Sequence, residues 1–221
     1  MNQKTILILT IQFGAGHRRV AEAVSKSCER EFPAWDARVV DVTPCMPWWI
    51  RWVYVDLYLL VLKYAPSLWR WIEGVQRKQP HTFPPELLQS TADRLYQQVK
   101  GWSIDAIITS EVGVNEIASI LKSRHLPDTP LVAVLTDYDA DRAWIQKEVD
   151  IYCAGSEEVR TELLSLGAPV EKVRVTGIPV DDQFFKSSPQ PMDAQEDVNR
   201  PPTLRLLLAG GGEGLLKVDP L

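Results

Sequence analysis

Residues 5–17 read Thr-Ile-Leu-Ile-Leu-Thr-Ile-Gln-Phe-Gly-Ala-Gly-His, and they give the clearest indication of the fold class. The apolar, β-branched run from Thr5 to Thr10 predicts a buried strand. Gly14 and Gly16 allow the backbone to turn sharply after it. A helix is expected from about Arg18 to Glu31. A strand, a glycine-bearing turn and a helix in this order are typical of a parallel α/β sheet.

The same alternation continues along the chain. Further short apolar strands are expected at Ala37 to Val42, Asp105 to Thr109, Leu131 to Leu135, Ile151 to Ala154 and Val173 to Thr176. Helices are expected at Pro84 to Val99, Val114 to Arg124 and Glu157 to Leu166. Gly167 is expected to end the last of these helices as a C-cap. The chain is therefore predicted to have an α/β fold with a parallel sheet.

Composition narrows the function classes. The net charge is −5 and the pI is near 5.3, so no global charge attracts nucleic acid or an anionic membrane. The three cysteines (Cys28, Cys45 and Cys153) form no CxxC motif, which predicts neither a disulfide framework nor a metal site. The apolar run at the N-terminus is too short for a signal peptide, so the chain is expected to be cytoplasmic.

Composition also divides the chain into three parts. Residues 1–185 carry the α/β pattern, and residues 186–202 are rich in proline and polar side chains, as interdomain linkers are. Residues 203–221 begin with a second apolar strand, which runs into Gly210, Gly211 and Gly212. This last part is too short to form a domain, so it is expected to be the start of a truncated second domain.

His17 is the first candidate for chemistry. It follows Gly14 and Gly16 at the expected start of a helix, where free N–H groups and the helix dipole favour an anion. An imidazole at this position can act as a base near neutral pH, or it can simply cap or pack the turn. A dinucleotide fingerprint is an alternative, because Asp41 ends the next strand. Arg19, however, occupies the place of the third glycine in that motif.

Asp137 and Trp144 are further candidates. Asp137 directly follows the strand Leu131 to Leu135, at the sheet edge where open α/β sheets bind ligands. A solvated loop carboxylate is the alternative for Asp137. Trp144 lies in the same loop region, and its indole fits either an apolar ligand or the core.

The segment from Pro47 to Lys78 carries five of the eight tryptophans, with tyrosines and basic residues between them. Its apolar run from Val53 to Leu62 contains Asp56 and is too short to span a bilayer. Aromatic rings with basic neighbours are typical of a helix that lies in the headgroup layer, and Pro66 is expected to split this helix. A buried helix or a dimer contact is the alternative. Membrane contact is predicted for Trp48, Trp49 and Trp52.

Together these motifs resemble a known family. In order they are Gly-Ala-Gly-His, the Trp-rich insertion, Leu-Thr-Asp-Tyr, Val-Asp-Ile-Tyr-Cys-Ala, Val-Thr-Gly-Ile-Pro-Val and Leu-Leu-Leu-Ala-Gly-Gly-Gly. The set is similar to glycosyltransferase family 28, in the branch of monogalactosyldiacylglycerol synthases and processive diacylglycerol glucosyltransferases. The resemblance implies the N-terminal, Rossmann-like half of a GT-B enzyme. Asp141 and Gln146 depart from the family pattern, which usually has histidines there.

The resemblance also implies roles. His17 matches the family's candidate base, while Gly14, Gly16, Asp137 and Trp144 match its diacylglycerol-binding side. Gly210 to Gly212 match the first loop of the UDP-sugar domain, most of which is missing. The expected activity is hexose transfer from a UDP-sugar to diacylglycerol at a membrane surface. It needs no cofactor or metal, and the chain is expected to be inactive alone.

Two other functions stay open at this point. One is a related transferase that acts on a polyprenyl-linked sugar, and the other is a non-catalytic lipid-binding subunit. A nicotinamide-dependent enzyme is a more distant alternative, because only part of the dinucleotide fingerprint is present.

Overall fold

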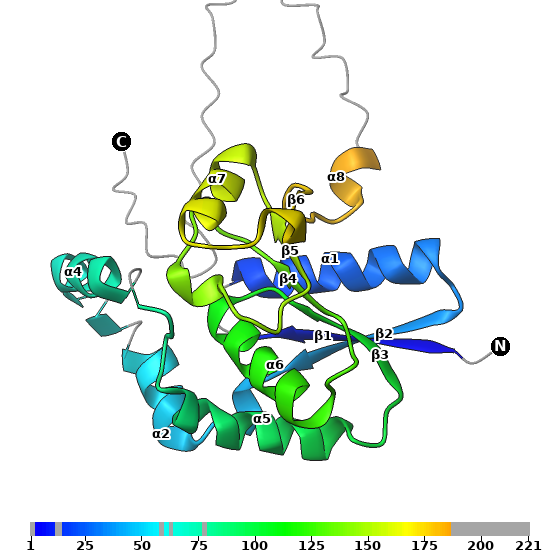
Figure 1. Ribbon diagram of the computed structural model, residues 1–221, viewed down its shortest axis with the longest axis horizontal. Helices are drawn as coiled ribbons and strands as arrows, with labels where there is room; N and C mark the ends of the chain where they lie inside the picture. Colours follow the sequence, from blue (N-terminus) through cyan, green and yellow to red (C-terminus); the bar gives the residue numbers. More distant parts are fainter. Residues whose placement is uncertain (1–2, 12–14, 58–59, 62–63, 77–78, 187–221) are drawn as a thin grey trace, which may run out of the picture.

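The computed structural model describes residues 3–11, 15–57, 60–61, 64–76 and 79–186. Its centre is a parallel sheet of six strands in the order β2-β1-β3-β4-β5-β6 (Figure 1). The strands are β1 (Lys4–Thr10), β2 (Trp35–Asp41), β3 (Ile104–Thr109), β4 (Leu131–Val134), β5 (Ile151–Ala154) and β6 (Val173–Val175). The prediction of an α/β fold with a parallel sheet is confirmed.

Helices cover both faces of this sheet (Figure 1). The helix α1 (Ala15–Glu31) lies on one face, and α5 (Pro85–Val99) and α6 (Val112–His125) lie on the other. Successive side chains of β1 point to opposite faces of the sheet. Ile6 and Ile8 pack with α1, while Leu7 and Leu9 belong to the larger core with α5 and α6. Burial on both faces explains why β1 reads as an unbroken apolar run rather than an alternating one.

The expected elements appear with small shifts at their ends. The largest shift is in α1, which begins at Ala15 instead of Arg18, so that His17 lies in its first turn. The helix α7 (Glu157–Ser165) ends as predicted, because Gly167 has a φ of 104°. Its neighbour Ala168 donates to the carbonyl of Leu163 at 2.9 Å, and Gly167 donates to that of Leu164 at 3.1 Å. These bonds form a Schellman cap.

Several short elements connect β2 to α5. They are η1 (Thr43–Cys45), α2 (Trp48–Arg51), the π-helical η2 (Trp52–Leu57) and α4 (Pro66–Gln76). The helix α4 begins at Pro66, which agrees with the expected break there. Figure 1 shows α2 and α4 beside the end of the sheet opposite the N-terminus of β1, with α4 away from the strands. Within the described residues, no helix is both long and apolar enough to cross a membrane.

The remaining described elements are η3 (Arg142–Trp144), η4 (Val170–Lys172) and α8 (Gln183–Lys186). Some predictions fall on residues outside the described ranges. These are Gly14, nearly all of the linker 186–202, and residues 203–221 with Gly210, Gly211 and Gly212.

Candidate functional site

The sheet order creates a natural place for a site. From β1 the chain goes first to β2 on one side and then to β3 on the other side of β1. The carboxyl ends of β1 and β3 therefore lie at a topological switch point, where ligands bind in open α/β sheets. His17 follows β1 and Ser110 follows β3, so the topology brings these two residues together.

The side chain of His17 is half-buried and makes two contacts through one ring nitrogen. Its Nδ1 lies 2.9 Å from the carbonyl oxygen of Ser110 and 2.8 Å from the hydroxyl oxygen of Thr136. The Thr136 hydroxyl also lies 3.3 Å from the Ser110 carbonyl. Among the described residues, none forms a hydrogen bond with Nε2 of His17. The imidazole is thus oriented through Nδ1, and a ligand that approached Nε2 would displace none of the described hydrogen bonds.

A second layer of hydroxyl groups supports this corner. The Ser110 hydroxyl donates to the main-chain carbonyl of His17 at 3.1 Å and lies 3.2 Å from the hydroxyl of Thr10. Ser110 is only 1% exposed and Thr10 is buried beside it. These bonds join the ends of β1 and β3 to the first turn of α1, so the position of His17 is fixed by buried groups.

Sequence reasoning missed Ser110 and Thr136 as partners of His17, and Thr10 as the partner of Ser110. Each is a hydroxyl residue at or just after the carboxyl end of an apolar strand. Parallel strands bring their carboxyl ends to one edge of the sheet, so this position in the sequence could have indicated that the three residues lie near His17.

The other predicted site residues differ in their surroundings. Asp137 directly follows Thr136 and is exposed at the same edge of the sheet. Gly16 lies in the first turn of α1, and a Cβ built there would meet no described atom within 4 Å. The described part of the chain therefore does not itself demand a glycine at this position. Asp41 accepts hydrogen bonds from the main chain (2.9 Å) and hydroxyl (2.6 Å) of Thr43, so it stabilises a turn.

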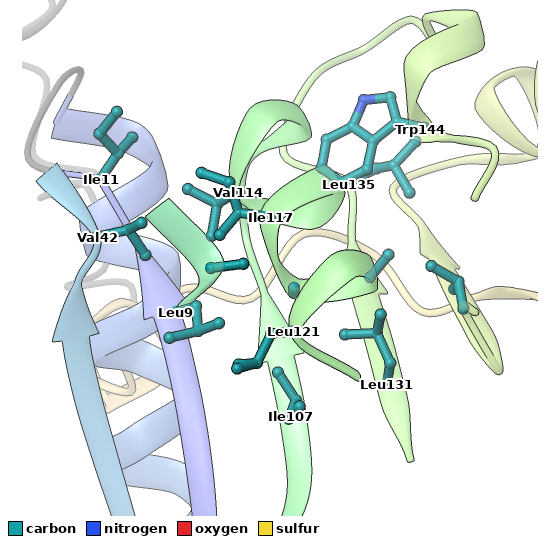
Figure 2. Close-up of a cluster of buried hydrophobic side chains, with 14 of the residues drawn as sticks. Leu9, Ile11, Val42, Ile107, Val114, Ile117, Leu121, Leu131, Leu135 and Trp144 are labelled. Atoms are coloured by element: carbon teal, nitrogen blue, oxygen red, sulfur yellow. The ribbon is translucent and has the colours of Figure 1, made fainter. Parts of the chain in front are cut away.

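Trp144 has a different environment from the one expected. Its side chain is 1% exposed and belongs to the main hydrophobic core, beside Leu135 in Figure 2. Asn115 donates to its carbonyl at 3.0 Å and fixes the turn that carries it. Gln146, where the family usually has a histidine, bonds to the carbonyl of Ala143 at 2.8 Å. The indole thus fills the core rather than lining an open cleft, and we do not include it in the site proposed below.

The predicted membrane contacts are exposed. Trp48 is 80% exposed, Trp49 39% and Trp52 52%. Ile50, in the same turn of α2, is 1% exposed and is part of the main core. On α4, large exposed side chains recur with helical spacing, at Leu68, Trp71 and Val75. We call these exposed residues of α2, η2 and α4 the aromatic surface: Trp48, Trp49, Trp52, Val53, Leu68, Trp71 and Val75.

A buried carboxylate joins the segment after α4 to the core. Glu116 on α6 is 2% exposed and accepts a hydrogen bond from the main chain of Thr82 at 2.7 Å and another from the Thr82 hydroxyl. Its other oxygen lies 3.1 Å from Nδ1 of His81. Burial raises the pKa of Glu116 to about 8, the bonds from Thr82 oppose this shift, and the charge of Glu111 adds to it. Across the described residues, no cluster of three or more His, Cys, Asp or Glu has the arrangement of a metal site.

The fold is an α/β sheet with His17 at its switch point, and comparison with known proteins gives the family. The family model described as monogalactosyldiacylglycerol (MGDG) synthase matches residues 17–180. The chain belongs to this family.

Curated relatives are diacylglycerol glucosyltransferases. The chain is 24% identical over 217 residues to the processive diacylglycerol beta-glucosyltransferase of Bacillus licheniformis, covering 97% of this chain and 55% of that protein. It is 23% identical to the Bacillus subtilis protein of the same name, with 97% and 56% covered. The chain thus spans about half the length of these relatives.

Two solved structures align with most of this chain at low sequence identity. The lipopolysaccharide outer core galactosyltransferase WaaB is 12% identical with a TM-score of 0.47, covering 78% of this chain and 44% of that one. Anabaena HepE in complex with UDP and glucose is 14% identical with a TM-score of 0.46, covering 84% and 47%.

Proposed function

We propose that this chain supplies the acceptor half of a two-domain GT-B glycosyltransferase that transfers a hexose from a UDP-sugar to diacylglycerol. The observation that carries the proposal is the placement of His17 at the switch point, where it is held through Nδ1. Membership of the MGDG synthase family and the names of the curated relatives support diacylglycerol as the acceptor. Because the chain spans about half of those relatives, the UDP-sugar is assigned to a second domain.

The reaction assigns one role to His17. Its Nε2 accepts the proton of the diacylglycerol 3-hydroxyl as that oxygen bonds to the anomeric carbon. The bond between the anomeric carbon and the UDP oxygen breaks, and UDP leaves with the electron pair. Gly14, Gly16 and the exposed Asp137 form the acceptor side of the site in this proposal. A general base of this kind usually contributes roughly a hundredfold or more to the rate.

The aromatic surface is proposed to hold the protein at the headgroup layer of a membrane. A soluble helix normally turns its apolar stripe inward, yet α4 exposes Leu68, Trp71 and Val75. The exposed Arg51 and Arg70 lie between these side chains in sequence and suit anionic headgroups. In α2, the buried Ile50 anchors the turn that exposes Trp48. This arrangement brings a lipid acceptor to the same end of the sheet as His17.

We propose that residues 1–185 form the acceptor domain, residues 186–202 a linker, and residues 203–221 the start of a second domain. In this division, Gly210, Gly211 and Gly212 begin the UDP-sugar domain. Limited proteolysis tests the boundaries, because an exposed proline-rich linker is cut before a packed domain. We expect first cuts within residues 186–202 and a resistant core that ends near residue 185. First cuts inside the sheet region would contradict the division.

A transfer assay tests the function. The chain alone is expected to give no transfer, while the chain fused to or co-expressed with a UDP-sugar domain of a relative should glycosylate diacylglycerol in mixed vesicles. A polyprenyl-linked sugar serves as the competing acceptor in the same assay. Transfer to the polyprenyl acceptor alone would identify the related transferase instead. Vesicle binding without transfer to either acceptor would favour a lipid-binding subunit.

A further inference from the structure

The contacts of His17 determine which ring nitrogen carries its hydrogen. Nδ1 lies 2.9 Å from the Ser110 carbonyl oxygen, which can only accept a hydrogen bond. This distance therefore requires a hydrogen on Nδ1, because the other tautomer would place a nitrogen lone pair against the oxygen. In a neutral imidazole, a hydrogen on Nδ1 leaves Nε2 as the acceptor.

The hydroxyl of Thr136 completes this arrangement. It lies 2.8 Å from Nδ1 of His17 and 3.3 Å from the carbonyl of Ser110. When the hydroxyl donates its hydrogen to the carbonyl, its oxygen accepts from Nδ1 and all three groups are satisfied. If it donated to Nδ1 instead, the ring nitrogen would have no hydrogen for the Ser110 carbonyl. One arrangement of hydrogens thus fits all three distances.

We propose that Thr136 is a positioning residue which, with the main-chain carbonyl of Ser110, holds His17 with its hydrogen on Nδ1 and with Nε2 unprotonated. The inference rests on the proposed role of His17 as the base. During transfer Nε2 gains a proton and the ring becomes a cation, which two oxygen acceptors at Nδ1 stabilise. In the Ser-His-Asp arrangement a carboxylate holds this nitrogen, whereas here its described partners are a carbonyl and a hydroxyl.

The tautomer can be measured in the chain itself, without the second domain. The sequence has three histidines, so nitrogen-15 spectra of ring-labelled protein are simple, and His17→Asn assigns the signals of His17. At a pH where the ring is neutral, wild-type His17 is expected to show a protonated Nδ1 and an unprotonated Nε2. A protonated Nε2 and an unprotonated Nδ1 would overturn the inference.

Two substitutions at residue 136 test its role. Thr136→Val has nearly the same shape but no hydroxyl, and it is expected to increase the share of His17 with hydrogen on Nε2. Thr136→Ser restores the hydroxyl and should restore the wild-type spectrum. An unchanged tautomer in Thr136→Val, or failure of the serine to restore it, would show that Thr136 does not position the ring.

Turnover separates this inference from the proposed function. In the chain joined to a UDP-sugar domain, Thr136→Val is expected to lower kcat about tenfold, the scale for losing a hydrogen bond to a group that becomes charged. Thr136→Ser should recover most of this loss. If the tautomer is as inferred but His17→Asn keeps full turnover, the proposed base is wrong although the ring is held as described. If the wild-type ring has the opposite tautomer but His17→Asn strongly lowers turnover, His17 is important for transfer and the inferred role of Thr136 is wrong.

Discussion

The corner around His17 and the aromatic surface follow opposite rules of burial. At the corner, polar groups of Ser110 and Thr10 are buried and satisfied by hydrogen bonds. On α2 and α4, large apolar side chains such as Trp48 and Trp71 are exposed. Buried hydroxyls hold the main chain that carries His17 in one position, whereas exposed rings suit a partner without fixed geometry, such as a lipid surface. The difference separates a region suited to chemistry from a region suited to attachment.

Trp144 extends the comparison, because it is a tryptophan in the hydrophobic core, unlike the exposed tryptophans of the aromatic surface. Trp144→Ala should lower the free energy of unfolding by about 3–5 kcal/mol, the usual cost of removing a core aromatic. Urea denaturation of the chain measures this loss, and Trp144→Phe should lose much less. Wild-type stability of the alanine variant would show that the indole is not part of the core, and its expected role at an acceptor cleft would regain support.

His17 tests the chemistry of the corner. In the chain joined to a UDP-sugar domain, His17→Asn should lower turnover by roughly a hundredfold, equivalent to about 2.7 kcal/mol. Vesicle flotation should not change, because His17 lies outside the aromatic surface. Arg19→Ala is the matched control in the same helix turn and should keep its turnover, since this side chain is exposed and pairs with Glu22. Near-full turnover of His17→Asn would make the imidazole a structural group.

Glu116 is a buried polar group on α6, and it binds Thr82 in the segment between α4 and α5. Its folded pKa of about 8 lies above the ordinary value of 4.5, so the folded protein keeps a proton that the unfolded chain loses. The contribution of this proton to the free energy of unfolding is fully present below pH 4.5 and is lost as the pH rises to about 8. The free energy of unfolding falls by at most about 1.4 kcal/mol per pH unit in this range.

Glu116→Gln removes this dependence, because the amide stays neutral and still accepts from Thr82. Urea denaturation should therefore show similar stability of variant and wild type near pH 4.5, and a more stable variant at pH 8. A difference in unfolding free energy that does not change with pH would mean that the carboxylate does not titrate as described.

The aromatic surface is tested by paired substitutions, one in α2 and one in η2. Trp48→Ala together with Trp52→Ala should weaken binding to anionic vesicles about tenfold, or about 1.4 kcal/mol, part of the transfer free energy of one large apolar side chain. The free energy of unfolding should change little, since both rings are exposed. Ile50→Ala is the control on the buried face and should cost about 2–5 kcal/mol of stability. Equal flotation of wild type and double variant would remove the membrane role.

Local patterns in the sequence were sufficient for the sheet and for several ends of elements. The apolar run of β1, the cap at Gly167 and the break at Pro66 were all predicted, because each depends on residues close together in the chain. The density of tryptophan in residues 47–78 likewise marked the segment that exposes Trp48, Trp52 and Trp71. These features follow from side-chain shape, backbone freedom and spacing.

Only the tertiary structure determined the partners of His17. Ser110 is 93 residues away in sequence and Thr136 is 119 residues away, and they meet His17 because β3 and β4 lie on one side of β1. The burial of Trp144 and Glu116 also depends on which helix covers which face. Spacing along the chain carries no such information, since the order of strands is set by the packing of the whole sheet.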